Sequence, residues 1–162
     1  MDRAMGVSIL QLPADCDRWD EVLALITRAF AAMDGVIDPP SSAHQLSPEN
    51  LRDKAGRETV FAALKDGRIV GCAFVLERTD DLYVGKLAVE PELQGQGIGR
   101  RLVQAVEALA HGRNKPTIAL QTRIELTGNH AAFARLGFRE TERTAHDGYS
   151  QPTSITMRKA LS

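Results

Sequence analysis

The spacing of hydrophobic residues in the first part of the chain changes from alternation to a helical period. Val7 to Leu12 alternates weakly, which predicts a short strand. Between residues 19 and 33, apolar side chains recur at steps of three and four, and this spacing predicts an amphipathic helix. Asp15 or Asp17 is placed to cap that helix, and Gly35 to end it.

A loop and a second helix follow. Val36 to Gln45 has no helical period, and its paired prolines and serines predict a loop. Ser47 and Pro48 then supply an N-terminal cap and a first-turn proline, so we expect a second helix that runs to about Lys54.

The middle of the chain has a period of two, which predicts three consecutive strands. Thr59 to Leu64 and Ile69 to Leu76 are apolar runs joined through Asp66-Gly67, a strong hairpin signal, so these two strands are expected to pair antiparallel. Leu82 to Val89 returns as the next strand of the same meander.

Glycines separate this third strand from a long helix. Apolar residues recur at Ile98, Leu102 and Val106, and the helical pattern ends near Gly112. Thr117 to Thr122 then forms a compact apolar strand. A strand, a helix and a second strand in this order predict a right-handed parallel crossover.

The chain closes with a short helix and two strands. We expect the helix from Asn129 to Leu136, and the strands from Phe138 to Thr144 and from Ser154 to Leu161. The elements together predict an α/β (α+β) fold with a mixed, mostly antiparallel sheet of six to seven strands, about four helices and one central parallel pair. We expect one domain spanning residues 1–162.

The amino-acid composition gives no sign of binding to nucleic acid, membranes or metal ions. The 162 residues include 20 basic and 21 acidic side chains, for a formal net charge of −1, so no global field favours nucleic acid or an anionic membrane. The apolar stretches are too short to span a membrane, and we expect a cytoplasmic protein. Cys16 and Cys72 have no metal-ligand spacing and are too few for a disulfide framework, so both are expected to be reduced and no metal is expected.

The glycine-rich turn after the third strand has the composition of an anion site. Gly95, Gly97 and Gly99 leave backbone N–H groups accessible, and the following helix adds unpaired donors and the positive end of its dipole. Arg100 adds a positive charge. The dinucleotide pattern G-x-G-x-x-G does not fit, because the third glycine arrives one residue early, and no Gly-Lys-Ser or Gly-Lys-Thr follows. A pyrophosphate is the expected ligand.

Two segments resemble a known family. Gln94-x-x-Gly97-x-Gly99, preceded by Leu-Ala-Val-x-Pro, resembles the acetyl-CoA-binding motif of the GNAT superfamily of N-acetyltransferases, and the helix from Asn129 to Gly137-Phe138 resembles its Asn-led terminal helix. The resemblance implies a GNAT-like fold and acetyl-CoA as acetyl donor. It also implies that the pantetheine arm pairs with the strand edge at Leu87 to Val89 while the parallel strands splay, with Gly85 marking a bulge.

The resemblance assigns cofactor contacts residue by residue. The expected cofactor-binding residues are Leu87, Ala88, Val89, Gln94, Gly95, Gln96, Gly97, Ile98, Gly99, Arg100, Asn129 and Phe133. Two positions depart from the family pattern: Phe133 stands where a tyrosine is frequent, and Asn129 lies closer to the Gly-Phe pair than usual.

Acetyl transfer to an amine requires that protons move. An alkyl ammonium, with a pKa of about 10.4, must lose a proton before it attacks the thioester. Glu125 and His130 are candidates for the base or for a water relay. Tyr83 occupies the place where the family often has a glutamate, and Tyr149 is a candidate proton donor in place of the missing tyrosine. Each of the four also has an ordinary structural interpretation.

The predicted activity is acetyl-CoA-dependent N-acetyl transfer to a primary amine of a small molecule or peptide, by direct attack in a ternary complex. The sequence does not identify the amine acceptor. The segments expected to contact it are Val36 to Gln45, with Asp38 and His44 as polar contributors, and His146 to Gln151. The alternative is a non-catalytic acyl-CoA sensor or structural subunit on the same fold. A homodimer is a further possibility.

Overall fold

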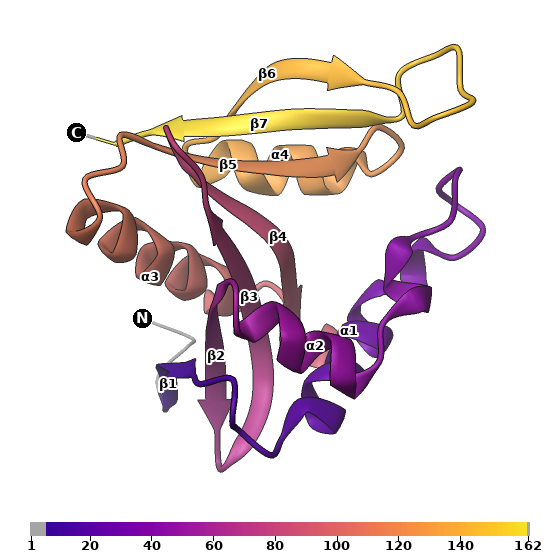
Figure 1. Ribbon diagram of the computed structural model, residues 1–162. Helices are drawn as coiled ribbons and strands as arrows, with labels where there is room; N and C mark the ends of the chain where they lie inside the picture. Colours follow the sequence, from indigo (N-terminus) through magenta and orange to yellow (C-terminus); the bar gives the residue numbers. More distant parts are fainter. Residues whose placement is uncertain (1–5, 162) are drawn as a thin grey trace.

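The computed structural model describes residues 6–161, so both ends of the predicted domain lie outside the described residues. Seven strands form one sheet in the order β1-β2-β3-β4-β5-β7-β6 (Figure 1). Their bounds are Val7–Leu12 (β1), Thr59–Lys65 (β2), Arg68–Glu77 (β3), Leu82–Val89 (β4), Thr117–Arg123 (β5), Arg139–Thr144 (β6) and Ser154–Ala160 (β7). Only β4 and β5 run parallel among these strands, which confirms the predicted fold class.

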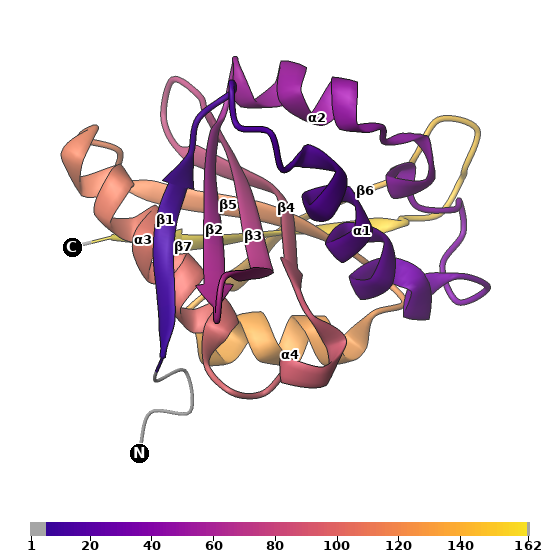
Figure 2. The same ribbon diagram turned by 90° about the horizontal axis from the view of Figure 1, so that it is seen from below.

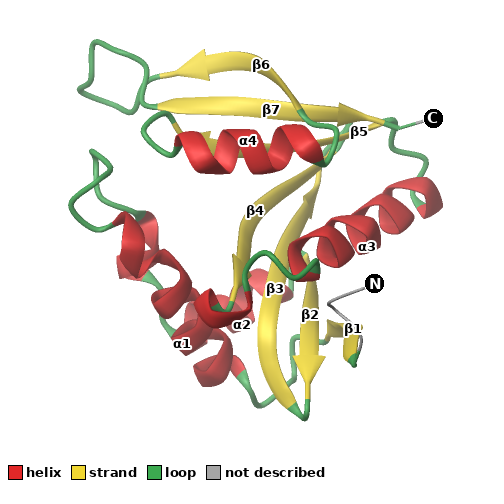
Figure 3. Cartoon of the chain, turned by 180° about the vertical axis from the view of Figure 1, so that it is seen from behind, coloured by secondary structure: helices red, strands yellow, loops and turns green. Residues whose placement is uncertain are grey.

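Four α-helices cover the sheet from two sides. They are α1 (Trp19–Phe30), α2 (Pro48–Ala55), α3 (Ile98–Gly112) and α4 (Thr127–Arg135). Figure 2 shows α1 and α2 on one side of the sheet and α3 and α4 on the other, and Figure 3 shows the face that α3 and α4 cover. The N-terminal and C-terminal halves of the chain therefore contribute helices to opposite faces.

Some predicted helix ends were wrong. Neither aspartate caps α1, because Arg18 occupies its N-cap position and pairs with Glu21 at 2.8 Å. The regular part of α1 ends at Phe30 and continues as a 3₁₀ turn over Ala31–Met33. The last helix, α4, begins two residues before Asn129, which therefore lies in its first turn.

Each face of the sheet has its own hydrophobic core. On the α1 face, Trp19 packs against Phe74 with ring centroids 6.2 Å apart, and Cys72 is fully buried among the same residues. Burial raises the pKa of the Cys72 thiol to about 12, so this thiol is unreactive. On the α3 face, Leu102 and Ile118 are fully buried. Side chains of this kind each contribute about 1.5–3 kcal/mol by leaving water.

The hairpin between β2 and β3 forms as its sequence predicts. Lys65 pairs with Arg68, and both residues between them have positive φ angles, 52° for Asp66 and 78° for Gly67. These angles match the turn that joins twisted antiparallel strands, and an Asp-Gly pair adopts them readily.

The parallel pair opens toward its C-terminal end. Pairing between β4 and β5 extends only from Leu82–Ile118 to Val84–Leu120. Next to the last pair, the register between β3 and β4 shifts so that Gly85 is the extra residue, which confirms the predicted bulge. Figure 1 shows the two strands starting side by side and then diverging. The remainder of β4 thus has no strand partner on its β5 side.

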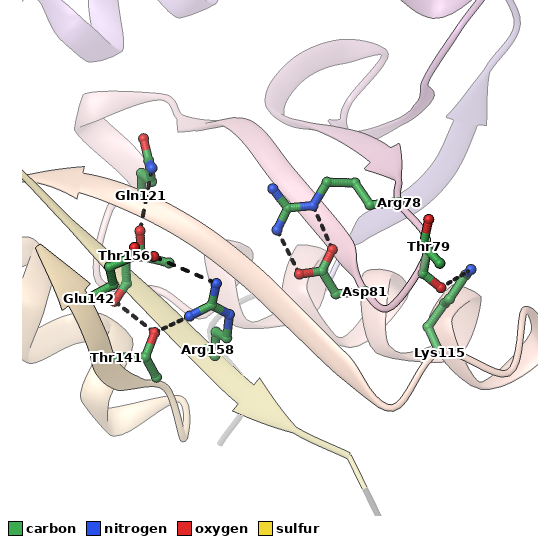
Figure 4. A network of polar contacts seen from close by, with 9 residues as sticks. All are labelled: Arg78, Thr79, Asp81, Lys115, Gln121, Thr141, Glu142, Thr156 and Arg158. Carbon is green, nitrogen blue, oxygen red and sulfur yellow. Dashed lines mark hydrogen bonds and ion pairs between the residues drawn. The ribbon is translucent and has the colours of Figure 1, made fainter. Parts of the chain in front are cut away.

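Polar contacts lie at the closed end of this opening (Figure 4). Arg78 and Asp81 form a two-pronged ion pair at 2.6 Å across the β3–β4 turn, and Lys115 donates to the carbonyl of Thr79 at 3.1 Å. The opening therefore lies between strands that are held together at only one end.

Candidate active site

A cavity of about 240 Å³ occupies the opening between β4 and β5. It is lined from both faces of the sheet. From the α1 side come the end of α1 and the loop after it, including Phe30, Met33, Ile37, Ser41 and Ser42; from the other side come Leu126, Asn129 and Phe133 of α4 and the turn before it. Two molecules that approach from opposite faces can therefore meet here.

The glycine loop has backbone angles that favour glycine. Gly95 has φ of 80°, and Gly97, at the N-cap of α3, has φ of 92°. Such angles are costly for residues with a Cβ atom. Gly99 is different, since a Cβ built there meets only Val89 Cγ2, at the ordinary distance of 3.9 Å. The first turn of α3 leaves the N–H groups of Ile98, Gly99 and Arg100 without intrahelical acceptors.

The two neighbouring arginines have different surroundings. Arg100 is exposed beside the loop. Arg101 instead donates through its guanidinium to the carbonyl of Val7 in β1. Of the two, Arg100 is the one placed for an anion at the glycine loop.

The end of β4 connects this loop to the cavity. Leu87 pairs with Ala73, and Val89 with Gly71, so the β3 side of the strand is occupied while its β5 side faces the opening. Gln94 donates through Nε2 to the Val89 carbonyl at 3.3 Å, which holds the loop against the strand. The unpaired edge of β4 therefore leads directly to the backbone N–H donors of the glycine loop and of the first turn of α3.

The first turns of α4 form the far wall. Asn129 and Phe133, both predicted from sequence, line the cavity. Phe133 meets Phe138 edge to face, with ring centroids 5.9 Å apart. A phenyl ring has no proton to donate, so this wall offers shape rather than acid catalysis.

Of the four candidate catalytic residues, Tyr83 lines the cavity. Its ring lies under the Arg78 guanidinium, with Cζ 4.7 Å from the centroid. Burial raises the pKa of the Tyr83 phenol, and the Arg78 charge partly opposes this rise. The phenol therefore keeps its proton near neutral pH, which suits a proton donor better than a base.

The other three candidate catalytic residues form hydrogen bonds with neighbouring loops and strand ends. Glu125 Oε2 accepts the Asp38 N–H at 3.1 Å, and the Tyr149 hydroxyl donates to Asp38 Oδ1 at 2.6 Å, a bond that raises the pKa of Tyr149. His130 contacts the Arg123 carbonyl through Nε2 at 2.9 Å. A carbonyl only accepts, so Nε2 carries the proton. As catalytic groups these three stay predictions.

The two segments expected to contact the acceptor meet in space. The bond between Tyr149 and Asp38 joins the β6–β7 connection to the loop after α1, and Figure 1 shows both on the same side of the molecule. His44, also predicted as a polar contributor, pairs with Asp34 at 2.7 Å instead of lining the cavity.

Sequence reasoning missed five polar residues that line the cavity: Lys86, Gln121, Thr122, Arg123 and Ser154. His146, which also lines it, belongs to a segment that was expected to contact the acceptor. His146 is held through Nδ1 and its backbone N–H by Thr153 Oγ1, the latter at 2.9 Å. Thr122 Oγ1 is buried and has no hydrogen-bond partner among the described residues. Strand alternation marks such residues as inward or outward, but it cannot show that the strand opens beside them.

Two kinds of site are not found in the part of the chain that the structure describes. No group of three or more His, Cys, Asp or Glu side chains there is arranged to hold a metal ion. No helix within residues 6–161 is long and apolar enough to cross a membrane.

A mixed sheet that opens at its parallel pair, beside a glycine-rich helix start, places a free strand edge next to a site for an anion, as suits a protein that binds an extended anionic ligand. The particular family follows from the sequence. The model of the acetyltransferase (GNAT) family matches residues 19–138, and the chain belongs to this family. The predicted family and enzyme class are therefore confirmed.

The chain is also similar to individual proteins that are named acetyltransferases. The aminoglycoside N(6′)-acetyltransferase type 1 of Stenotrophomonas maltophilia is 36% identical over 107 residues, which cover 60% of this chain and 69% of that protein. The IAA acetyltransferase of Azospirillum brasilense is 29% identical over 130 residues, covering 78% and 82%. The fold is similar to that of the PaiA N-acetyltransferase of Thermoplasma acidophilum in complex with coenzyme A, with a TM-score of 0.82, 17% identity, and coverage of 97% and 100%.

Proposed function

We propose that the protein transfers the acetyl group of acetyl-CoA to a primary amine by direct attack in a ternary complex. The observation that carries this proposal is the cavity at the opening between β4 and β5, which is lined from both faces of the sheet. A donor between the strands and an acceptor under the loop after α1 would meet there. The amine nitrogen bonds to the acetyl carbon, the carbon–sulfur bond breaks, and CoA leaves as a thiol.

Backbone groups hold the donor in this proposal. The N–H groups from Gly95 to Arg100, with the dipole of α3, receive the pyrophosphate. The free edge at Leu87 to Val89 pairs with the pantetheine amides as an added strand, and its N–H groups face the developing oxyanion. Asn129 and Phe133 close the other side of the arm. The similar PaiA fold was solved in complex with coenzyme A, which supports coenzyme A binding by this fold.

Protons move through groups that line the cavity. We assign the base to His146, because its ring is held through Nδ1 while Nε2 has no bond to a described residue. An imidazole nitrogen that carries no hydrogen can accept a proton. The Tyr83 phenol is protonated before the reaction and donates this proton to the leaving thiolate. Glu125, His130 and Tyr149 position the loops.

The pH dependence of turnover distinguishes these assignments. His146→Gln is expected to lower kcat by about 100-fold and to remove the fall of kcat at low pH, because a general base acts only when it is unprotonated. Glu125→Gln is the matched comparison and is expected to change mainly the acceptor KM. A shifted kcat profile in Glu125→Gln alone would return the relay role to Glu125.

The activity itself is tested by measuring thiol release from acetyl-CoA with a broad panel of amines. Turnover of at least one amine, with loss of cofactor binding in Gly97→Glu, is the expected result. Acetyl-CoA binding without turnover of any amine would favour the non-catalytic sensor.

Assembly and location are proposals as well. We propose that a second copy pairs along β6, one of the two edge strands of the sheet, whose residues are largely exposed. Light scattering at several concentrations tests this homodimer. A cytoplasmic location agrees with free Cys16 and Cys72 and with the supply of acetyl-CoA.

A further inference from the structure

Two cations line the acceptor side of the cavity. Lys86 follows the bulge in β4, and Arg123 is the last residue of β5, so the opening brings both to one space. Lys86 Nζ donates to Ser42 Oγ at 3.1 Å. Arg123 donates to the carbonyls of Pro39 and Pro40 at 2.6 and 3.2 Å. These contacts hold the two side chains in place without neutralising their charges.

The nearby carboxylates already have other partners. Glu58 pairs with Lys54 at 3.0 Å. Asp38 accepts from Tyr149, and Glu125 accepts from the backbone of Asp38. No Asp or Glu lines the cavity within the described part of the chain, and neither Lys86 nor Arg123 forms a salt bridge there.

The charges of Lys86 and Arg123 repel each other, and an anion bound between them would relieve this repulsion. Burial lowers the pKa of Lys86, and the charges of Lys54 and Arg123 lower it further, against a smaller opposing effect of Glu58. An electrostatic cost of this kind is typical of binding sites rather than of structural ion pairs. An oxyanion offset from the reacting amine would form charge-assisted hydrogen bonds with both groups.

We propose that the acceptor is an amine that also carries a carboxylate, and that Lys86 and Arg123 bind this carboxylate. This inference rests on the proposed acetyl transfer. Lys86 directly precedes Leu87, where the pantetheine pairing begins, so the carboxylate lies close to the reacting nitrogen. A cavity of about 240 Å³ suits a compact amino acid. A polycation such as an aminoglycoside, the substrate class of one relative, would place ammonium groups against two fixed cations.

The test compares matched acceptors. Phenylalanine with phenethylamine, and leucine with isopentylamine, differ only in the carboxylate, while phosphoethanolamine with ethanolamine tests a phosphate. The wild type is expected to prefer the amino acids by about 10- to 100-fold in kcat/KM. Preference for the amines that lack a carboxylate would overturn the inference and leave the transfer reaction standing. Preference for phosphoethanolamine alone would overturn the carboxylate assignment.

Variants identify the group responsible. Lys86→Met is expected to remove most of the preference by lowering kcat/KM for phenylalanine more than for phenethylamine, and Lys86→Arg to restore the preference in part. Lys65→Met, at the β2–β3 hairpin, is the matched control and is expected to have no effect. An unchanged preference in Lys86→Met would contradict the role given to Lys86.

Calorimetry with the N-acetylated amino acid products and CoA supplies a second measurement that needs no turnover. Binding that Lys86→Met weakens by about tenfold or more supports the carboxylate site. If acetyl-CoA binds but neither the acids nor their N-acetyl forms do, the carboxylate inference fails whatever the chemistry of the protein.

Discussion

The donor and acceptor sides of the cavity recognise their ligands by different means. On the donor side, the glycine loop and the edge of β4 offer backbone N–H groups fixed by φ angles and by the start of α3. On the acceptor side, side chains such as Lys86 and Arg123 project from the ends of two strands under a loop. Binding through backbone N–H groups should be lost when a substitution adds a side chain that blocks them. Binding through charged side chains should be lost when a substitution removes the charge.

The largest expected effect comes from adding a side chain to the donor loop. Gly97→Glu forces a positive φ on a residue with a Cβ and brings a carboxylate to the proposed pyrophosphate site, so acetyl-CoA affinity should fall by more than about 100-fold. Isothermal calorimetry measures this. Gly112→Glu, at the other end of the same helix, is the control and should bind normally. Equal affinity in Gly97→Glu and wild type would remove the loop from cofactor binding.

A partly buried ion pair connects the two sides. Glu90, directly after β4, is 7% exposed and accepts from Arg28 of α1 at 2.7 and 3.0 Å. Glu90→Gln should lower the free energy of unfolding by about 1–2 kcal/mol, less than for a fully buried pair because Arg28 is 48% exposed. If the two sides behave independently, kinetic constants for donor and acceptor should change little in this variant.

The same pair has a pH signature. The Arg28 hydrogen bond holds the pKa of Glu90 below its usual range. A lowered native pKa contributes stability above the unfolded-state pKa of about 4.3, and this contribution is lost as pH falls through the native value. Denaturant titrations should therefore show the gap between wild type and Glu90→Gln shrinking as pH falls below about 4.3. A gap that widens on acidification would contradict the pairing.

A third variant tests whether the loop contact on the acceptor side positions or catalyses. Tyr149→Phe removes the bond to Asp38 and should raise the acceptor KM by about threefold to tenfold, with kcat and acetyl-CoA affinity nearly unchanged. Steady-state kinetics separate the constants. A fall in kcat at constant KM would instead support the proton-donor role predicted for Tyr149 from the sequence.

The sequence predicts the two sides unequally well. The donor loop is marked by residue types that its backbone requires, such as Gly97, and the Asp66-Gly67 hairpin is predicted for the same reason. The role of Lys86 is hidden, because the bulge at Gly85 interrupts the alternation that would assign its face. Arg123 is hidden as well, since a strand end faces a cavity only when the neighbouring strand diverges. Local backbone chemistry is thus predictable, while contacts created by the opening of the sheet are not.

The smallest expected effect concerns a side chain of β5 that lines the cavity. Thr122 is 7% exposed, and its hydroxyl has no hydrogen-bond partner in the described part of the chain, so the free protein bears the cost of an unsatisfied polar group. Thr122→Val keeps the shape and should stabilise the free protein by up to about 1 kcal/mol. If the hydroxyl pairs with the bound donor, acetyl-CoA affinity should fall by about threefold, as calorimetry and thermal unfolding measured together can show.

The matched control for this variant is Thr156→Val. Thr156 is also buried but accepts from Gln121 Nε2 at 3.3 Å, so its replacement breaks a hydrogen bond and should destabilise the protein without affecting acetyl-CoA. Opposite signs of the stability change in the two variants, with an affinity loss only in Thr122→Val, would identify one side chain that the donor side uses. Lower stability in Thr122→Val with unchanged affinity would leave donor recognition to the backbone alone.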